Sequence, residues 1–119
     1  MKGKKVLLMV EPPKAALDRA ISVMKSRTHK YKGTLIISFP DFETLERVIT
    51  GARLELLHAI RMNKPKSIQK LAKVVERDFK NVYQDVKLLA EYGLIELKEA
   101  GPRKASTPKA NFSELILAA

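Results

Sequence analysis

The sequence contains no cysteine. This absence excludes disulfide bonds, thiolate zinc sites, iron–sulfur clusters and thiol nucleophiles, and it fits a reducing compartment. Long apolar runs are missing too: the longest early run, Val6–Val10, ends at Glu11-Pro12-Pro13, far short of the roughly 20 residues that span a bilayer. We therefore expect a soluble, cytoplasmic protein that has no membrane partner.

Glycine is scarce, and its five residues stand singly, so the chain has no glycine-rich loop to cradle a phosphate group. The two histidines, His29 and His58, lack the spacing of a metal site and have no evident acidic partner. The acid pairs Glu43/Glu46 and Glu96/Glu99 are explained by helix and surface charge. The sequence therefore predicts no catalytic residues, no metal site, no cofactor and no enzyme activity.

Acidic residues are few: 13 Asp and Glu stand against 23 Lys and Arg, which gives a net charge of +10 in 119 residues. Hydrophobic residues make up 45% of the chain, enough for one ordinary globular domain. A charge surplus of this size on a small body predicts a polyanionic partner or target surface.

The positive charge lies in three blocks. Residues 1–32 carry a net +7, residues 63–87 a net +4 and residues 101–110 a net +3, whereas the remaining segments sum to −4. One lysine-rich block alone is typical of a solvated surface. Two blocks that fall on the same binding motif favour a nucleic-acid-binding surface instead. The positions of the blocks in the fold therefore decide between the two interpretations.

The front half of the chain predicts a strand, a helix and a second strand. The strands are Val6–Val10 and Thr34–Phe39, with Arg27–Gly33 as a loop. Between them an apolar helical face repeats at Leu17, Ala20, Ile21 and Met24. Asp41 is positioned to cap a further helix with an apolar side at Phe42, Leu45, Val48 and Ile49.

The back half predicts three helices followed by a β-hairpin. Thr50, Ser67 and Asp78 are the expected N-caps, and Gly93 the expected helix stop. The apolar faces are Leu54, Leu56, Leu57 and Ile60; then Ile68, Leu71, Ala72 and Val75; then Phe79, Val82, Val86 and Leu89. Leu94–Leu97 and Lys104–Pro108 are the expected strands, joined by a turn at Glu99–Arg103. Only Glu76-Arg77 separates the second and third helices, which predicts a helix-turn-helix followed by a wing.

The outward face of the third of these helices suits DNA. With Val82 at the centre of the buried side, a spacing of 100° per residue turns the polar residues outward. We expect Lys80, Asn81 and Gln84 to read bases. Phosphate-binding residues are expected at Ser67, Lys73, Arg77, Tyr83 and Lys87, with Arg103 and Lys104 acting from the wing.

Residues 50–97 resemble the winged helix-turn-helix regulators of the MarR/ArsR type, and are similar to small predicted prokaryotic transcriptional regulators and antitoxins. The matching pieces are Arg53-Leu54-Glu55-Leu56-Leu57, Ser67 with Leu71-Ala72, Asp78-Phe79-Lys80-Asn81-Val82, Asp85-Val86 and Gly93-Leu94-Ile95-Glu96. That family often has Gly at the helix–helix turn, where this chain has Glu76. The resemblance implies a DNA-binding repressor that acts as a homodimer.

The expected fold is α+β, mainly α: a winged helix-turn-helix at residues 50–108 with an N-terminal strand–helix–strand extension at 1–49. Residues 109–119 are expected to be an apolar tail, strand or helix, that packs on the domain or the dimer. The expected partners are double-stranded DNA and a second copy of the chain. The alternative is an antitoxin whose N-terminal half binds a cognate toxin, with DNA autoregulation secondary.

Overall fold

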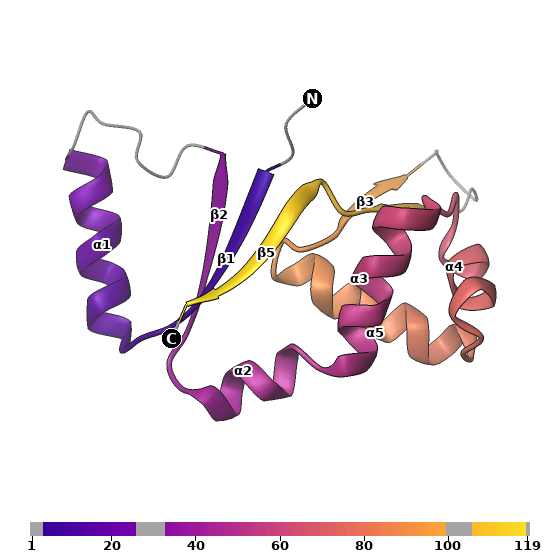
Figure 1. Cartoon of the computed structure of the whole chain (residues 1–119), viewed down its shortest axis with the longest axis horizontal. Coiled ribbons are helices and arrows are strands. Elements are labelled where there is room, and N and C mark those ends of the chain that lie inside the picture. The colour runs from indigo at the N-terminus through magenta and orange to yellow at the C-terminus, as the bar shows by residue number, and fades with distance from the viewer. Residues whose placement is uncertain (1–3, 26–32, 100–105, 119) are drawn as a thin grey trace. The chain divides into compact units, whose positions relative to one another are not determined.

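The computed structural model describes residues 4–25, 33–99 and 106–118 (Figure 1). In these ranges the chain has an α+β fold with more helix than strand, as expected. It divides into two compact units: unit 1 is Met1–Arg47 with Phe112–Ala119, and unit 2 is Val48–Asn111. None of the helices in the described ranges is both long enough and apolar enough to cross a bilayer.

Unit 1 is built on a three-stranded parallel sheet. Strand β1 (Lys4–Val10) lies in the middle, with β2 (Thr34–Phe39) on one side and β5 (Phe112–Ala118) on the other. The two strands predicted in the front half are thereby confirmed. The last apolar segment, for which the sequence left strand or helix open, is a strand that pairs with β1. In this register Leu8 lies between Ile37 and Leu117.

Helix α1 (Pro13–Lys25) connects β1 to β2, and its apolar face is exposed rather than packed in a core. None of its residues is buried. Leu17 is 60% exposed and Met24 is 85% exposed. A helix normally gains most of its stability from packing its apolar face. Helix α1 gains little from such packing, because none of its residues is buried.

A small polar cluster ties α1 to the sheet. The Arg19 guanidinium donates to the Glu11 carboxylate and, at 3.0 Å, to Ser38 Oγ. Ser38 Oγ in turn donates to Glu11 Oε1 at 2.7 Å. The hydrogen bonds from Arg19 and then Ser38 hold the pKa of Glu11 below its ordinary value. Burial opposes that shift, but the bonds to the charged form outweigh it.

Helix α2 (Phe42–Val48) begins at the predicted cap. Both the backbone N–H and the hydroxyl of Thr44 donate to Asp41 Oδ1, each at 2.7 Å. These two bonds lower the pKa of Asp41. Leu45 and Val48 are buried as expected, whereas Phe42 is exposed.

Unit 2 contains α3 (Gly51–Asn63), α4 (Ile68–Val75) and α5 (Phe79–Glu91). The predicted caps of the first two helices are confirmed, because Thr50 Oγ1 accepts from the Arg53 N–H at 3.2 Å and Ser67 Oγ from the Lys70 N–H at 3.1 Å. Helices α3 and α4 both end at residues with left-handed backbones, Lys64 (φ 47°) and Glu76 (φ 53°).

For α5, the predicted residue at the C-terminal end is confirmed, whereas the predicted N-terminal cap is not. Asp78 precedes the helix, but its side chain makes no capping hydrogen bond, so that part of the prediction was wrong. Its backbone (φ −58°) departs from the more extended φ of −101° and −152° at Thr50 and Ser67, which changes the direction of the side chain. Gly93 (φ 85°) ends the helix as predicted, with the Leu94 N–H donating to the Leu89 carbonyl at 3.0 Å.

The core of unit 2 joins all three helices to the start of the hairpin. Its most buried apolar residues, each 2% exposed or less, are Leu56, Ile60, Leu71, Val82, Val86, Leu89 and Leu94. Phe79, predicted to face inward, is 48% exposed, so that prediction was wrong. Phe79 is the first residue of α5, and helical side chains tilt toward the N-terminus, so its ring projects past the end of the core.

A two-stranded antiparallel hairpin follows the helices. It pairs β3 (Glu96–Glu99) with β4 (Ser106–Lys109), and Glu96 lies opposite Lys109. The predicted strand at Leu94–Leu97 begins two residues late, because Leu94 and Ile95 are used as core residues before the pairing starts. Residues 100–105, which include most of the predicted turn, lie outside the described residues.

Candidate nucleic-acid interface

The three candidate base-reading residues share the outward face of α5. Lys80, Asn81 and Gln84 are all exposed, and so is Lys87 on the same helix. Val82, Val86 and Leu89 hold the opposite face in the core with no measurable exposure. The helix is therefore a firmly packed support that presents two ammonium groups and two amides, which together offer hydrogen bonds to phosphates and to base edges.

An aromatic pair borders this polar face. The rings of Phe79 and Tyr83 stack with centroids 5.9 Å apart, and Lys87 Nζ lies 5.9 Å from the centroid of Tyr83. Tyr83 is 42% exposed. Tyr83, predicted to bind phosphate, is thus stacked on Phe79 at the border of the polar face. The sequence analysis did not predict this aromatic pair. The spacing of four residues between the two rings was the available signal.

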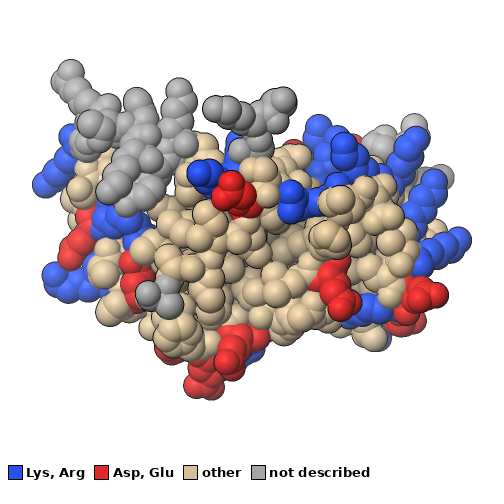
Figure 2. All heavy atoms as spheres, in the orientation of Figure 1, with Lys and Arg blue, Asp and Glu red and all other residues tan. Residues whose placement is uncertain are grey.

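The other candidate phosphate ligands differ in how free they are. Lys73 is exposed on α4, where Lys and Arg side chains gather at the end of unit 2 that holds this helix (Figure 2). Ser67 is half-buried, and its hydroxyl is already the cap of α4. Its remaining hydrogen-bonding capacity is the part that could serve a phosphate.

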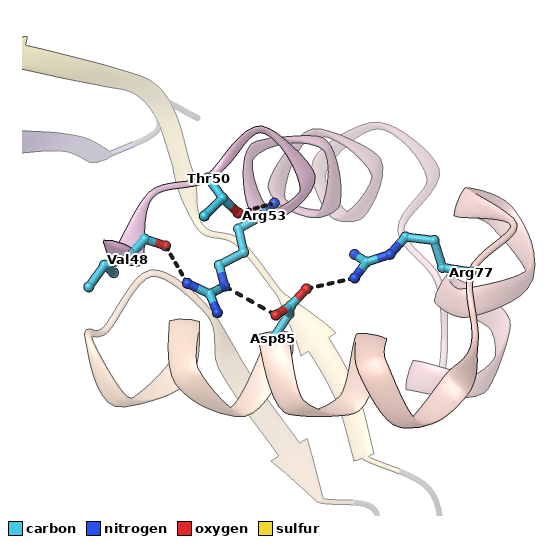
Figure 3. A network of polar contacts seen from close by, with 5 residues as sticks. All are labelled: Val48, Thr50, Arg53, Arg77 and Asp85. Atoms are coloured by element: carbon cyan, nitrogen blue, oxygen red, sulfur yellow. Dashed lines mark hydrogen bonds and ion pairs between the residues drawn. The ribbon is translucent and has the colours of Figure 1, made fainter. Parts of the chain in front are cut away.

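Arg77 belongs to an ion-pair network rather than to the exposed face (Figure 3). Its Nη2 donates to Asp85 Oδ2 at 2.9 Å, while Arg53 Nε donates to Asp85 Oδ1 at 3.1 Å. Arg53 also donates from Nη1 to the Val48 carbonyl at 2.9 Å. The Asp85 carboxylate, only 15% exposed, therefore links α5 to the start of α3 and to the turn after α4.

One end of the Arg77 guanidinium is buried without a hydrogen-bond partner in the described residues, namely Nη1. Its Nη2 is occupied by Asp85, so Arg77 positions the turn between α4 and α5 whether or not it also touches a phosphate. Sequence reasoning placed Arg77 on the outer face and gave Asp85 no role. The position of Asp85 between Gln84 and Val86, one residue from the buried side of α5, was the available signal for an internal partner.

The two candidate wing residues, Arg103 and Lys104, lie outside the described residues. His58, for which the sequence predicts no metal-binding role, is exposed on α3. In the described ranges no three His, Asp or Glu side chains are grouped so that they could hold a metal ion.

The model of the family HVO_A0114 matches residues 48–116 of the chain. This match covers more than half of the chain. The chain belongs to the HVO_A0114 family. The matched region contains the whole of unit 2 and most of β5. No curated protein and no solved structure matches the chain.

Proposed function

We propose that this member of the HVO_A0114 family is a sequence-specific double-stranded DNA-binding regulator of transcription, most simply a repressor. In this proposal α3, α4, α5 and the β3–β4 hairpin form a winged helix-turn-helix of the MarR/ArsR type, and α5 enters the major groove. The observation that carries it is the α5 face, where Lys80, Asn81, Gln84 and Lys87 are all exposed on a helix fixed by its opposite side.

The surroundings of α5 support the same assignment. A helix fits the major groove, and in this class of motif the residues near the start of the reading helix contact the bases. Lys80, Asn81 and Gln84 lie in the first half of α5. Lys73 and Lys87 supply charge for phosphates, with Ser67 and Tyr83 as further donors and Arg103 and Lys104 assigned to the wing.

Unit 1 supplies a surface for a second copy of the chain. Strands β2 and β5 are the two edges of the three-stranded sheet, and unpaired edges invite further strands. Helix α1 adds exposed Leu17, Ile21 and Met24. A two-fold dimer doubles the number of base pairs read, so we propose a homodimer built by unit 1.

The same exposed face supports the second candidate function, that of an antitoxin. In that case unit 1 binds a cognate toxin protein and DNA autoregulation is secondary. Capture of the product of a neighbouring gene by wild-type protein, lost in a Leu17→Gln/Met24→Gln variant with unchanged DNA affinity, would favour this alternative.

The DNA proposal is tested by selecting duplexes from a random pool and measuring affinity by fluorescence anisotropy. Gln84→Ala should relax base preference by about 1–3 kcal/mol at one position, whereas Lys87→Ala should weaken all duplexes alike and reduce the salt slope by about one. Lys25→Ala, which removes the same charge from α1, is the matched control. Equal affinity for every duplex at physiological salt would reject sequence-specific regulation.

The dimer is tested separately. Light scattering should give a mass of about 27 kDa, twice the 13.4 kDa of one chain. The Leu17→Gln/Met24→Gln variant should shift that mass toward one chain if α1 is in the interface. A wild-type monomer at micromolar concentration would reject the homodimer.

A further inference from the structure

Unit 2 contains a pocket of about 430 Å³ that the proposed DNA contact does not use. It lies between the end of α3, the connection to α4, and β4 with the residues that follow it. The lining residues are Ile60, Arg61, Lys64, Pro65, Lys66, Thr107, Pro108, Lys109, Ala110 and Asn111. None of them comes from α4 or α5.

The walls of this pocket are held by the fold. Pro65 and Pro108 are buried, and Ile60 is 2% exposed, so part of the lining is apolar and fixed. The Lys64 N–H donates to the Ile60 carbonyl at 3.1 Å, which sets the end of α3. Thr107 Oγ1 donates to the Lys66 carbonyl at 2.8 Å and fastens the connection to β4. The pocket is therefore formed before any ligand arrives.

The charge of the lining is of one sign. Arg61, Lys64, Lys66 and Lys109 are cationic, and no lining residue is acidic. Within the part of the chain that the structure describes, none of the three lysines is in an ion pair. Like charges that converge on one concavity repel one another, and an anionic ligand would relieve that repulsion.

One carboxylate lies beside this end of unit 2. Glu96 is the cross-strand partner of Lys109 and accepts a hydrogen bond from Asn111 Nδ2 at 3.1 Å. This hydrogen bond orients the Asn111 amide. Lys64 and Lys66 form no ion pair among the described residues, so the balance of the pocket stays positive.

We propose that this pocket binds a small polyanion, a metabolite that carries two or more phosphate or carboxylate groups. Its volume falls within the range of small-molecule sites, and its apolar residues suit a ligand with a carbon skeleton between its charged groups. A DNA backbone needs no such concavity. Because the ligand would bridge α3 and β4, it would fix the base of the hairpin and act as an effector beside the DNA-contacting helices.

The test uses the full chain and titration calorimetry with two probes, inorganic pyrophosphate and citrate. Lys66→Gln/Lys109→Gln removes two lining charges without altering a left-handed residue, and should weaken binding of either probe by about tenfold or more. Lys25→Gln/Lys70→Gln removes the same charge from exposed positions on α1 and α4 and should change affinity by less than about threefold. In the wild type, pyrophosphate should shift the amide NMR signals of Thr107 and Ala110.

Three results would overturn this proposal. The first is no binding of either probe at physiological salt. The second is equal weakening by the two double variants, which would mean attraction by net charge alone. In the third, Lys66→Gln/Lys109→Gln lowers duplex affinity but leaves the affinity for both probes unchanged, which would mean that the lysines serve the DNA backbone. The pocket stands apart from the proposed function: wild-type protein that binds the probes but no duplex would reject the DNA proposal only.

Discussion

Units 1 and 2 use helices of the same length in opposite ways. Helices α1 and α5 both have 13 residues and both carry apolar residues at helical spacing. In α5 that spacing yields Val82, Val86 and Leu89 with no measurable exposure, whereas in α1 it yields no buried residue. Periodicity therefore identifies an apolar face of a helix, and the rest of the fold decides whether that face becomes core or surface.

The largest change in the free energy of unfolding is expected where the buried core of unit 2 is compared with the exposed face of α1. Leu71→Ala removes a fully buried side chain at the centre of unit 2 and should lower the free energy of unfolding by about 3 kcal/mol. Leu17→Ala should change it by less than about 0.5 kcal/mol at protein concentrations where the chain is monomeric. Urea denaturation followed by circular dichroism measures both. A Leu17→Ala cost that grows with protein concentration would place α1 in a dimer interface.

The next effect concerns the ion pairs of the two units. Asp85→Ala leaves Arg53 and Arg77 without their shared acceptor and should lower the free energy of unfolding by about 2 kcal/mol. Asp18→Ala, which breaks the exposed pair with Lys14 on α1, should cost less than about 0.5 kcal/mol. Equal costs in the same denaturation series would show that the Asp85 network contributes no more than a surface pair.

A smaller effect, of opposite sign, is expected at the turn between α4 and α5. Glu76 has a left-handed backbone that costs a side-chain-bearing residue about 1 kcal/mol, so Glu76→Gly should raise stability by up to that amount. Glu55→Gly, at an exposed position inside α3, should lower stability by about 1 kcal/mol. The two variants should therefore shift the thermal midpoint in opposite directions, and a shared direction would refute the assignment of strain to Glu76.

The smallest expected effect is a change in how the free energy of unfolding depends on pH in the acid range. Because the folded-state pKa of Glu11 is lowered, its stabilising contribution is complete above the ordinary value near 4.5 and is lost as the pH falls from there through the lowered value. Glu11→Gln should flatten this part of the stability–pH curve, and so should Arg19→Gln. Arg19→Gln should flatten the curve less than Glu11→Gln, because Ser38 still donates to the Glu11 carboxylate. An Arg19→Gln curve as steep as that of the wild type would mean that Arg19 is not the main cause of the shift.

Local rules predicted the parts of the fold that depend on neighbouring residues. Thr50, Ser67 and Gly93 were identified as helix boundaries because capping needs only the residues next to them. The exposed positions of Lys80 and Gln84 followed from the 100° spacing around Val82, which puts Asn81 at the flank of the same face. That these residues read DNA stays a prediction.

Contacts that join distant parts of the sequence could not be predicted from local patterns. The pairing of β5 with β1, the contact of Arg53 with Asp85, and the pocket between Lys66 and Lys109 each need a tertiary arrangement that periodicity does not encode. The exposure of Phe79 has the same origin, because a helical position does not say where the covering element stops. Contacts between residues far apart in the sequence therefore had to come from the structure.

The pairing of β5 with β1 also sets an order of events during synthesis. Ser113 Oγ donates to the Lys4 carbonyl at 3.4 Å across 109 residues of chain, whereas unit 2 is continuous in sequence. Unit 2 can therefore form on the ribosome as soon as it has emerged. The sheet of unit 1 must wait for the last strand, and until then β1 keeps one open edge during translation.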